Sequence, residues 1–201
     1  NFVDVDNVKA AQTTVDYLIS LGHSRIAIVT PPLNTWVGET RLRGYRLALQ
    51  QHRVAQEAQL VYEGDFSEQS GYMAVMRFAQ QMLPTAILVA GDMMAQGAQR
   101  ALHELGHRVP NDVSLIGFDN LESSSLAAFN MTRMSQPVSA LGRHASIQLV
   151  ALLRRLAARD SMAKLGISFP FDAEKGPPDS PIQHLLDATL VLGGSTAAPK
   201  H

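Results

Sequence analysis

The sequence predicts an α/β protein built on a doubly wound parallel sheet. From Arg25 to Ile116, short apolar runs alternate with longer stretches in which apolar residues recur at helical spacing. This alternation is typical of parallel βαβ units with right-handed crossovers. The run Ile26–Val29 is apolar throughout, as expected for a strand that is buried on both faces of a sheet.

Each expected strand is a short apolar or alternating run that ends at a turn residue or a loop. Pro31 follows the second run, Pro84 precedes the fourth, and Gly117 ends the run that begins at Val113. Proline and glycine are the strongest local breakers of strands and helices. The expected strands are Phe2–Val5, Arg25–Val29, Leu60–Tyr62, Ala86–Ala90, Val113–Ile116, Met131–Met134 and Thr189–Leu192.

Each expected helix has one apolar stripe. Asp6 and Asn7 can cap the first helix, and Gly22 follows its end. The last helix is the longest, and its stripe includes Leu141 and Leu149. The expected helices span about 8–21, 40–51, 68–83, 92–105 and 138–158, and the proline-rich segment 163–182 is expected to be an irregular loop.

Composition limits the class of protein. The chain has 201 residues, of which 46% are hydrophobic and 17% charged, as in an ordinary globular domain. A net charge of −1 gives no basic footprint for nucleic acid, and the absence of cysteine fits a reducing cytoplasm. No apolar run approaches the roughly 20 residues of a membrane span, and no signal peptide opens the chain. The first residue is Asn1 rather than Met, so we expect a piece of a longer protein.

Loops that follow the expected strands carry the candidate binding residues. The carboxyl ends of parallel strands share one edge, where loops diverge and leave a crevice for ligands. A guanidinium and a carboxylate can bind hydroxyl groups through paired hydrogen bonds, and an aromatic ring can cover an apolar face or a base. These residue types therefore predict a site for a small polyol or nucleoside. The candidates are Thr35, Trp36, Arg41, Phe66, Gly91 and Asp119.

Each of these residues also has a purely structural interpretation. Asp119 can cap the turn after its strand. Arg41 can be a surface helix residue, Phe66 can belong to the core, and Trp36 can fill an interface. The residue types alone leave both interpretations open.

Several short motifs, in their order and spacing, resemble the lactose-repressor/galactose-repressor family of bacterial transcription regulators. Each motif is weak alone, but together they run through almost the whole chain. The matching segments are Asp6–Ala11, Tyr17–Ala27, Arg41–Tyr45, Gly64–Phe66, Ser70–Tyr72, Pro84–Ala86, Val109–Asp119, Thr132–Pro137, Leu141–Gly142 and Leu190–Thr196.

The resemblance implies a periplasmic-binding-protein-like type I fold, in which two α/β lobes are joined by crossing strands. It implies that residues 1–134 form a complete C-terminal lobe. Residues 135–201 are then return segments that complete the N-terminal lobe, followed by the C-terminal tail. A helix-turn-helix head and most of the first lobe are expected to precede Asn1.

The resemblance also implies roles for individual residues. It places Arg41, Phe66 and Asp119 at effector-contact positions and Gln136 near a lobe crossing. Gly91 departs from the pattern, because the family commonly has an asparagine there that bonds ligand hydroxyl groups. Glycine has no side chain that donates or accepts, so a bulkier ligand or a water is expected to replace that contact.

One motif suggests a different chemistry. The sequence from His103 to His107 reads His-Glu-Leu-Gly-His and matches a zinc-protease pattern. That pattern needs both imidazoles one turn apart on a continuous helix, but Gly106 falls where the helix should end. We therefore predict no metal site and no cofactor.

Together these features predict the effector-sensing core of a cytoplasmic DNA-binding regulator, and no enzyme. Its expected partners are a sugar-like or nucleoside-like metabolite, operator DNA reached through the absent head, and a second copy of the C-terminal lobe, with no membrane partner. The segment Leu126–Phe129 and the helix 92–105 are candidates for that dimer interface. One alternative is a periplasmic solute receptor of the same fold, which an upstream signal peptide would identify. Another is a doubly wound enzyme, although no nucleophile–base constellation is visible.

Overall fold

The computed structural model describes residues 2–118, 130–164 and 183–200, without the side chains of 154–164 and 183. The chain divides into two compact units. The larger unit comprises Asp6–Gln136 and Asp187–His201, and the smaller comprises Asn1–Val5 and Pro137–Leu186. Among the described residues, no helix is long and apolar enough to cross a membrane.

A six-stranded sheet in the order β3-β2-β4-β5-β6-β8 is the centre of the larger unit. Neighbouring strands from β3 to β6 pair in parallel, and β8 is antiparallel to β6. The central strands β2, β4 and β5 are buried throughout, which confirms the predicted α/β class. The strands are β2 (Ile26–Thr30), β3 (Val61–Glu63), β4 (Ala86–Val89), β5 (Ser114–Phe118), β6 (Thr132–Ser135) and β8 (Thr189–Val191).

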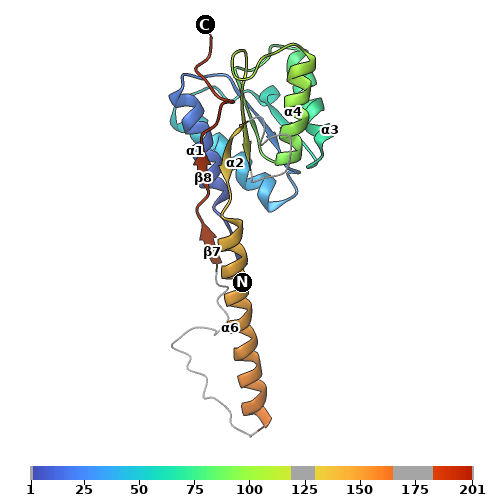
Figure 1. The fold of residues 1–201 in the computed structure, drawn as a ribbon. Helices are drawn as coiled ribbons and strands as arrows, with labels where there is room; N and C mark the ends of the chain where they lie inside the picture. Colours follow the sequence, from blue (N-terminus) through green and yellow to red (C-terminus); the bar gives the residue numbers. More distant parts are fainter. Residues whose placement is uncertain (1, 119–129, 165–182, 201) are drawn as a thin grey trace. The chain divides into compact units, whose positions relative to one another are not determined.

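Helices cover both faces of this sheet (Figure 1). The helices α1 (Asn7–Ser20) and α2 (Trp36–Gln51) pack together, as do α3 (Glu68–Ala79) and α4 (Asp92–Glu104). A short 3-10 helix (Ala58–Leu60) precedes β3. Alternate residues of the central strands join α3 and α4 in one large apolar core.

The helix α2 begins earlier than expected. The sequence pattern predicts a start near Thr40, with Trp36 in a loop, but the helix begins at Trp36. The cause is the cap: the Thr35 hydroxyl accepts a hydrogen bond from the Gly38 amide at 3.1 Å, which satisfies an otherwise unpaired donor of the first turn.

Glycines allow α3 and α4 to approach closely. A Cβ atom at Gly97 would overlap the carbonyl oxygen of Glu68, and a Cβ atom at Gly71 would overlap the carbonyl oxygen of Met94. Each overlap involves backbone rather than a flexible side chain, so the two helices cannot keep this separation with a larger residue at either position.

The smaller unit has a two-stranded parallel sheet and one long helix. The strand β1 (Phe2–Val5) pairs with β7 (Gln183–Leu186), and α6 (Val138–Lys164) packs on β1. The helix continues past its expected end at 158, so residues 163 and 164 are helical rather than part of the predicted loop, and the rest of that loop lies outside the described residues. The strand β7 was not expected from its sequence.

Strand pairing explains where the two units divide. β1 belongs to the smaller unit because it pairs with β7, and the segment from Asp187 belongs to the larger unit because β8 pairs with β6. The expected division into lobes at 1–134 and 135–201 stays a prediction, and it does not coincide with these compact units at either end of the chain.

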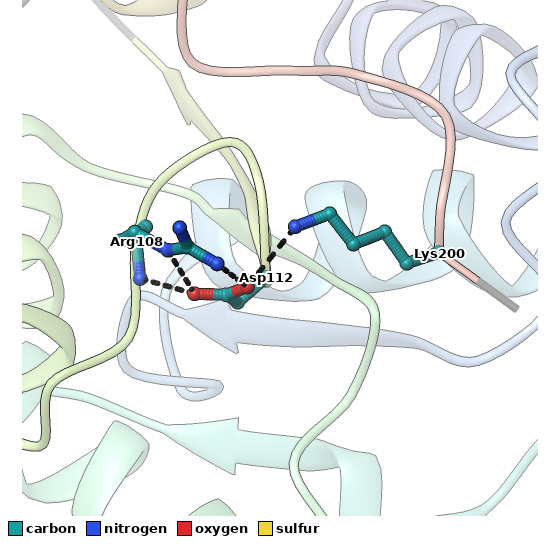
Figure 2. A network of polar contacts seen from close by, with 3 residues as sticks. All are labelled: Arg108, Asp112 and Lys200. Atoms are coloured by element: carbon teal, nitrogen blue, oxygen red, sulfur yellow. Dashed lines mark hydrogen bonds and ion pairs between the residues drawn. The ribbon is translucent and has the colours of Figure 1, made fainter.

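The C-terminal tail ends at the amino edge of the larger sheet. Figure 2 shows the Asp112 carboxylate, just before β5, accepting hydrogen bonds from the backbone and side chain of Arg108 and from Lys200. The Lys200 Nζ atom is 3.4 Å from Asp112 Oδ1. The Arg108 hydrogen bonds hold the pKa of Asp112 well below its usual range. The tail therefore leaves the opposite, carboxyl edge of the sheet uncovered by residues 193–200.

Candidate functional site

The carboxyl edge of the larger sheet gathers the loops that were expected to carry the site. Because β2, β3, β4, β5 and β6 are parallel, the residues that follow them lie along one edge. Those residues include Gly64, Ala90 and Gln136.

Arg41 on α2 is the centre of this edge. Its side chain is buried, at 3% exposure. Its Nε atom donates to Asn7 Oδ1 at 2.9 Å, and Nη1 donates to the Ala90 carbonyl at 3.0 Å. The guanidinium lies over the Phe118 ring, 3.8 Å from the ring centroid. The interpretation of Arg41 as a surface residue is therefore wrong.

This arrangement has a physical reason. Burying a charged guanidinium without hydrogen bonds would cost several kcal/mol in lost hydration. Part of the lost hydration is replaced by contacts within the protein. The guanidinium donates to Asn7 at the start of α1 and to Ala90 after β4, and it lies over Phe118 at the end of β5. Arg41 thereby connects the ends of α1, β4 and β5. A change in the position of its guanidinium would therefore affect all three elements.

Phe66 follows β3 in an unusual backbone conformation. Its φ angle is +69°, a left-handed value that is uncommon for a bulky residue. The Asp65 carboxylate supports the turn by accepting from the Ser67 amide at 2.9 Å and from the Ser67 hydroxyl. These hydrogen bonds, chiefly that of the hydroxyl, also lower the pKa of Asp65. Phe66 is 47% exposed, so the interpretation that it belongs to the core is wrong.

Gly91 lies next to Phe66. A Cβ atom on Gly91 would be 2.8 Å from Met94 Cε and 3.9 Å from Phe66 Cδ1. Its φ of 170° is extended backbone that any residue adopts, so space rather than conformation favours glycine here. The Met94 methyl group fills the space beside Gly91, and the edge after β4 is consequently lined by apolar atoms.

The other residues predicted for the site are Thr35, Trp36, Gln136 and Asp119. The Thr35 hydroxyl donates to the Pro32 carbonyl at 2.6 Å in addition to capping α2. Trp36 is 57% exposed and lies on a different face of α2 from Arg41, because five residues correspond to about 140° around a helix. Gln136 directly follows β6 and is half-buried, and Asp119 lies outside the described residues.

Sequence reasoning missed three contributors to this edge. Asn7 was expected only to cap α1, but Asp6 accepts from the Lys9 amide and Asn7 contacts Arg41 instead. The sequence places Phe118 at the carboxyl end of its strand and Met94 on the buried face of its helix, but it did not predict their positions beside Arg41 and Gly91.

The zinc-protease motif does not form a continuous helical face. The helix α4 ends at Glu104, and Gly106 has a φ of +76°, so His107 lies beyond the helix. In the described part of the chain, no group of three or more histidine and acidic residues could hold a metal ion.

Comparisons with known proteins agree with this architecture. The family model described as "periplasmic binding protein-like domain" matches residues 15–196. The HTH-type transcriptional repressor PurR of Edwardsiella ictaluri is 41% identical over 127 residues, covering 63% of this chain and 37% of the relative. The protein of the same name from Proteus mirabilis is 37% identical over 135 residues, covering 67% of this chain and 40% of the relative.

Solved structures show the same fold. A LacI-family regulatory protein from Chloroflexus aggregans superposes with a TM-score of 0.79 at 27% identity, covering 96% of this chain and 63% of that one. The dimeric Lac repressor with an 11-residue C-terminal deletion superposes with a TM-score of 0.79 at 29% identity. This match covers 100% of this chain and 65% of that one. The chain thus spans 37–40% of the length of the two curated relatives.

These matches place the chain in the class of proteins with a periplasmic-binding-protein-like fold. The chain belongs to the LacI family, as an effector-binding domain of its transcriptional regulators. The matched relatives are transcriptional repressors rather than enzymes.

Proposed function

We propose that the carboxyl edge around Arg41 binds a small sugar-like or nucleoside-like metabolite, and that binding controls attachment of the whole regulator to its operator. The observation that carries this proposal is that Arg41 contacts the Ala90 carbonyl and the Phe118 ring at the sheet edge where the exposed Phe66 also lies, 3.9 Å from where a Cβ atom on Gly91 would be. An exposed ring held in a strained turn, on the same sheet edge as a cation that links three elements, is suited to sensing a ligand.

The chemistry of the edge favours a ligand with both a polar and a flat apolar side. Phe66 offers exposed apolar surface near Gly91, where no side-chain hydrogen bond is available, and the methyl group of the buried Met94 lies beneath it. Polar contacts then come from Arg41, Gln136 and the Asp119 carboxylate that the sequence places after β5. Binding between two lobes, with a change in their relative orientation, is part of the same proposal.

The names of the relatives support proposals for two further partners, operator DNA and a second copy of the chain. Their names describe HTH-type repressors, so we propose that operator DNA is contacted by a helix-turn-helix head outside this chain, in the cytoplasm. We also propose a homodimer through the larger unit, because the exposed methionines Met73 on α3 and Met93 on α4 offer apolar surface and a structural neighbour is described as dimeric. A periplasmic receptor is the alternative, and the gene sequence upstream of Asn1 distinguishes the two.

The test is a thermal-unfolding screen of the protein against pentoses, hexoses, nucleosides and nucleobases, followed by calorimetry on any compound that raises the midpoint. Phe66→Ala should weaken binding about tenfold or more, because a ring that covers a ligand contributes on the order of 1–3 kcal/mol.

Met82→Ala is the control, since Met82 is also an exposed apolar residue, at 65%, and belongs neither to the proposed ligand site nor to the proposed dimer interface. Its affinity for the ligand should equal that of the parent protein. Equal affinity in Phe66→Ala, or an equal loss in both variants, would refute the proposed location.

A further inference from the structure

A groove runs along the outer face of α2, away from the edge described above. It has a volume of about 370 Å³. Its helical lining residues recur every three or four positions from Glu39 to Gln50, which places them on one face of the helix. Arg41 is two positions from Arg43, about 200° around the helix, so the groove and the Arg41 site use opposite faces of α2.

The groove has an apolar part with a fixed wall. Leu42 is buried, whereas Leu47 is 41% exposed and Leu33 is half-buried. The backbone amide of Leu33 donates to Glu63 Oε1 at 2.7 Å, which attaches this wall to the end of β3. An exposed leucine such as Leu47 is unusual on the solvent face of a surface helix, which is normally polar, and Leu33 and Leu42 extend its apolar surface into the groove.

The groove is also basic. Arg43 and Arg46 are exposed and lie one turn apart on α2. Like charges at this spacing repel each other. Neither arginine makes an ion pair with an acid in the described ranges, whereas Arg100 and Arg108 each pair with nearby carboxylates. Glu39 lies at the amino-terminal end of the groove and forms no ion pair with Arg43 among these contacts.

We propose that this groove is a docking site for an acidic segment of a partner protein. A carboxylate of the partner would bind Arg43 and Arg46, and an apolar side chain beside it would enter the space between Leu33, Leu42 and Leu47. Glu39 would repel an acid at the other end and so set the direction of the segment.

The apolar wall favours a peptide over nucleic acid. Phosphate backbones are bound by many cations, and affinity depends on the number of phosphates neutralised. Two arginines next to an acid and three leucines match the anchor-plus-charge pattern of a protein interface instead. The proposal does not depend on the effector site, because no residue of the groove belongs to it.

The test is fluorescence anisotropy of the protein with a fluorescein-labelled peptide in which glutamates alternate with leucines. One comparison peptide has glutamine in place of every glutamate, and another has serine in place of every leucine. We expect the glutamate–leucine peptide to bind and each comparison peptide to bind at least about tenfold more weakly, which corresponds to about 1.4 kcal/mol.

Variants of the protein locate the contact. The double substitution Arg43→Gln with Arg46→Gln and the single substitution Leu47→Ser should each reduce affinity at least about tenfold. Arg77→Gln on α3 removes the same charge from an exposed position elsewhere and should leave affinity unchanged. All of these positions are exposed, so circular dichroism should show unchanged unfolding.

Three results would overturn the proposal. The first is no binding of the glutamate–leucine peptide, and the second is an equal loss in Arg77→Gln. The third is binding of duplex DNA that depends on Arg43 and Arg46 while binding of the peptide does not.

Discussion

Buried polar side chains connect the elements of the larger unit at both edges of its sheet. At the carboxyl edge Arg41 bonds Asn7 and the Ala90 carbonyl. At the amino edge His23 is buried, with Nδ1 3.0 Å from Thr85 Oγ1 and Nε2 2.8 Å from the Ala197 carbonyl. Because that carbonyl can only accept, Nε2 carries the proton of the neutral ring.

Replacing Arg41 should reduce stability as well as ligand binding. Arg41→Met leaves the Asn7 and Ala90 acceptors without their donor, so we expect the free energy of unfolding to fall by about 2–4 kcal/mol. The stability of Arg41→Lys should lie between that of the parent protein and that of Arg41→Met, because lysine keeps the charge but lacks the planar guanidinium. Urea unfolding measures both, and a stability equal to that of the parent in Arg41→Met would contradict this role.

His23 should make stability depend on pH. Burial lowers the pKa of His23 below its ordinary value, so the unfolded chain binds a proton more readily than the folded one. The contribution is complete above about pH 6.5, the unfolded value, and is lost as the pH falls below it.

The corresponding experiment compares urea unfolding of the parent protein and His23→Gln between pH 7.5 and pH 5. The parent should lose stability faster on acidification, by no more than about 1.4 kcal/mol per pH unit, the limit for one proton. Identical slopes would show that His23 does not titrate differently in the two states.

At the scale of elements, the spacing of apolar residues predicted the helices and the strands of the larger sheet. Apolar runs and apolar helix stripes are local features, so they can be recognised in the sequence alone. Boundaries depended on capping contacts, as the Thr35 hydroxyl shows for α2. The strand β7 could not be predicted because its pairing with β1 joins residues about 180 positions apart. The Arg41 contacts with Asn7 and Phe118 are non-local in the same way, so their residue types were visible but their partners were not.

The close packing of α3 and α4 depends on Gly97. Gly97→Ala would place a methyl group on the Glu68 carbonyl, so we expect a loss of about 1–3 kcal/mol or more, despite the better helix propensity of alanine. Gly142→Ala on α6 is the control, because a Cβ there meets nothing within 4 Å. It should leave stability unchanged or raise it. Thermal unfolding distinguishes the two, and a neutral Gly97→Ala would mean that the helices can separate without cost.

At the scale of the whole molecule, the proposed dimer predicts a specific sensitivity. Two-fold pairing brings a charged substitution close to its own copy. Met73→Glu with Met93→Glu should therefore shift the protein from dimer to monomer in analytical ultracentrifugation. Met82→Glu, at an exposed methionine in the loop before β4, should not.

Arg100 is less suitable for this experiment than the sequence suggested. It pairs with Glu68 at 2.7 Å and lies over the Tyr72 ring, so reversing its charge would disturb α3 and α4 directly. The candidate segment Leu126–Phe129 lies outside the described residues. A dimer that persists in the Met73 and Met93 double variant would place the interface on another face.

The effector site at the carboxyl edge is tested most directly by NMR of the ¹⁵N-labelled protein, titrated with the metabolite that the thermal screen selects. We predict that the Arg41 Nε–H and the amides of Phe66 and Gly91 shift in proportion to occupancy. The amides of Ser114 and Ala197, at the amino edge, should stay in place. Shifts confined to the amino edge, with the Arg41 Nε–H signal unchanged at saturation, would contradict the proposed site.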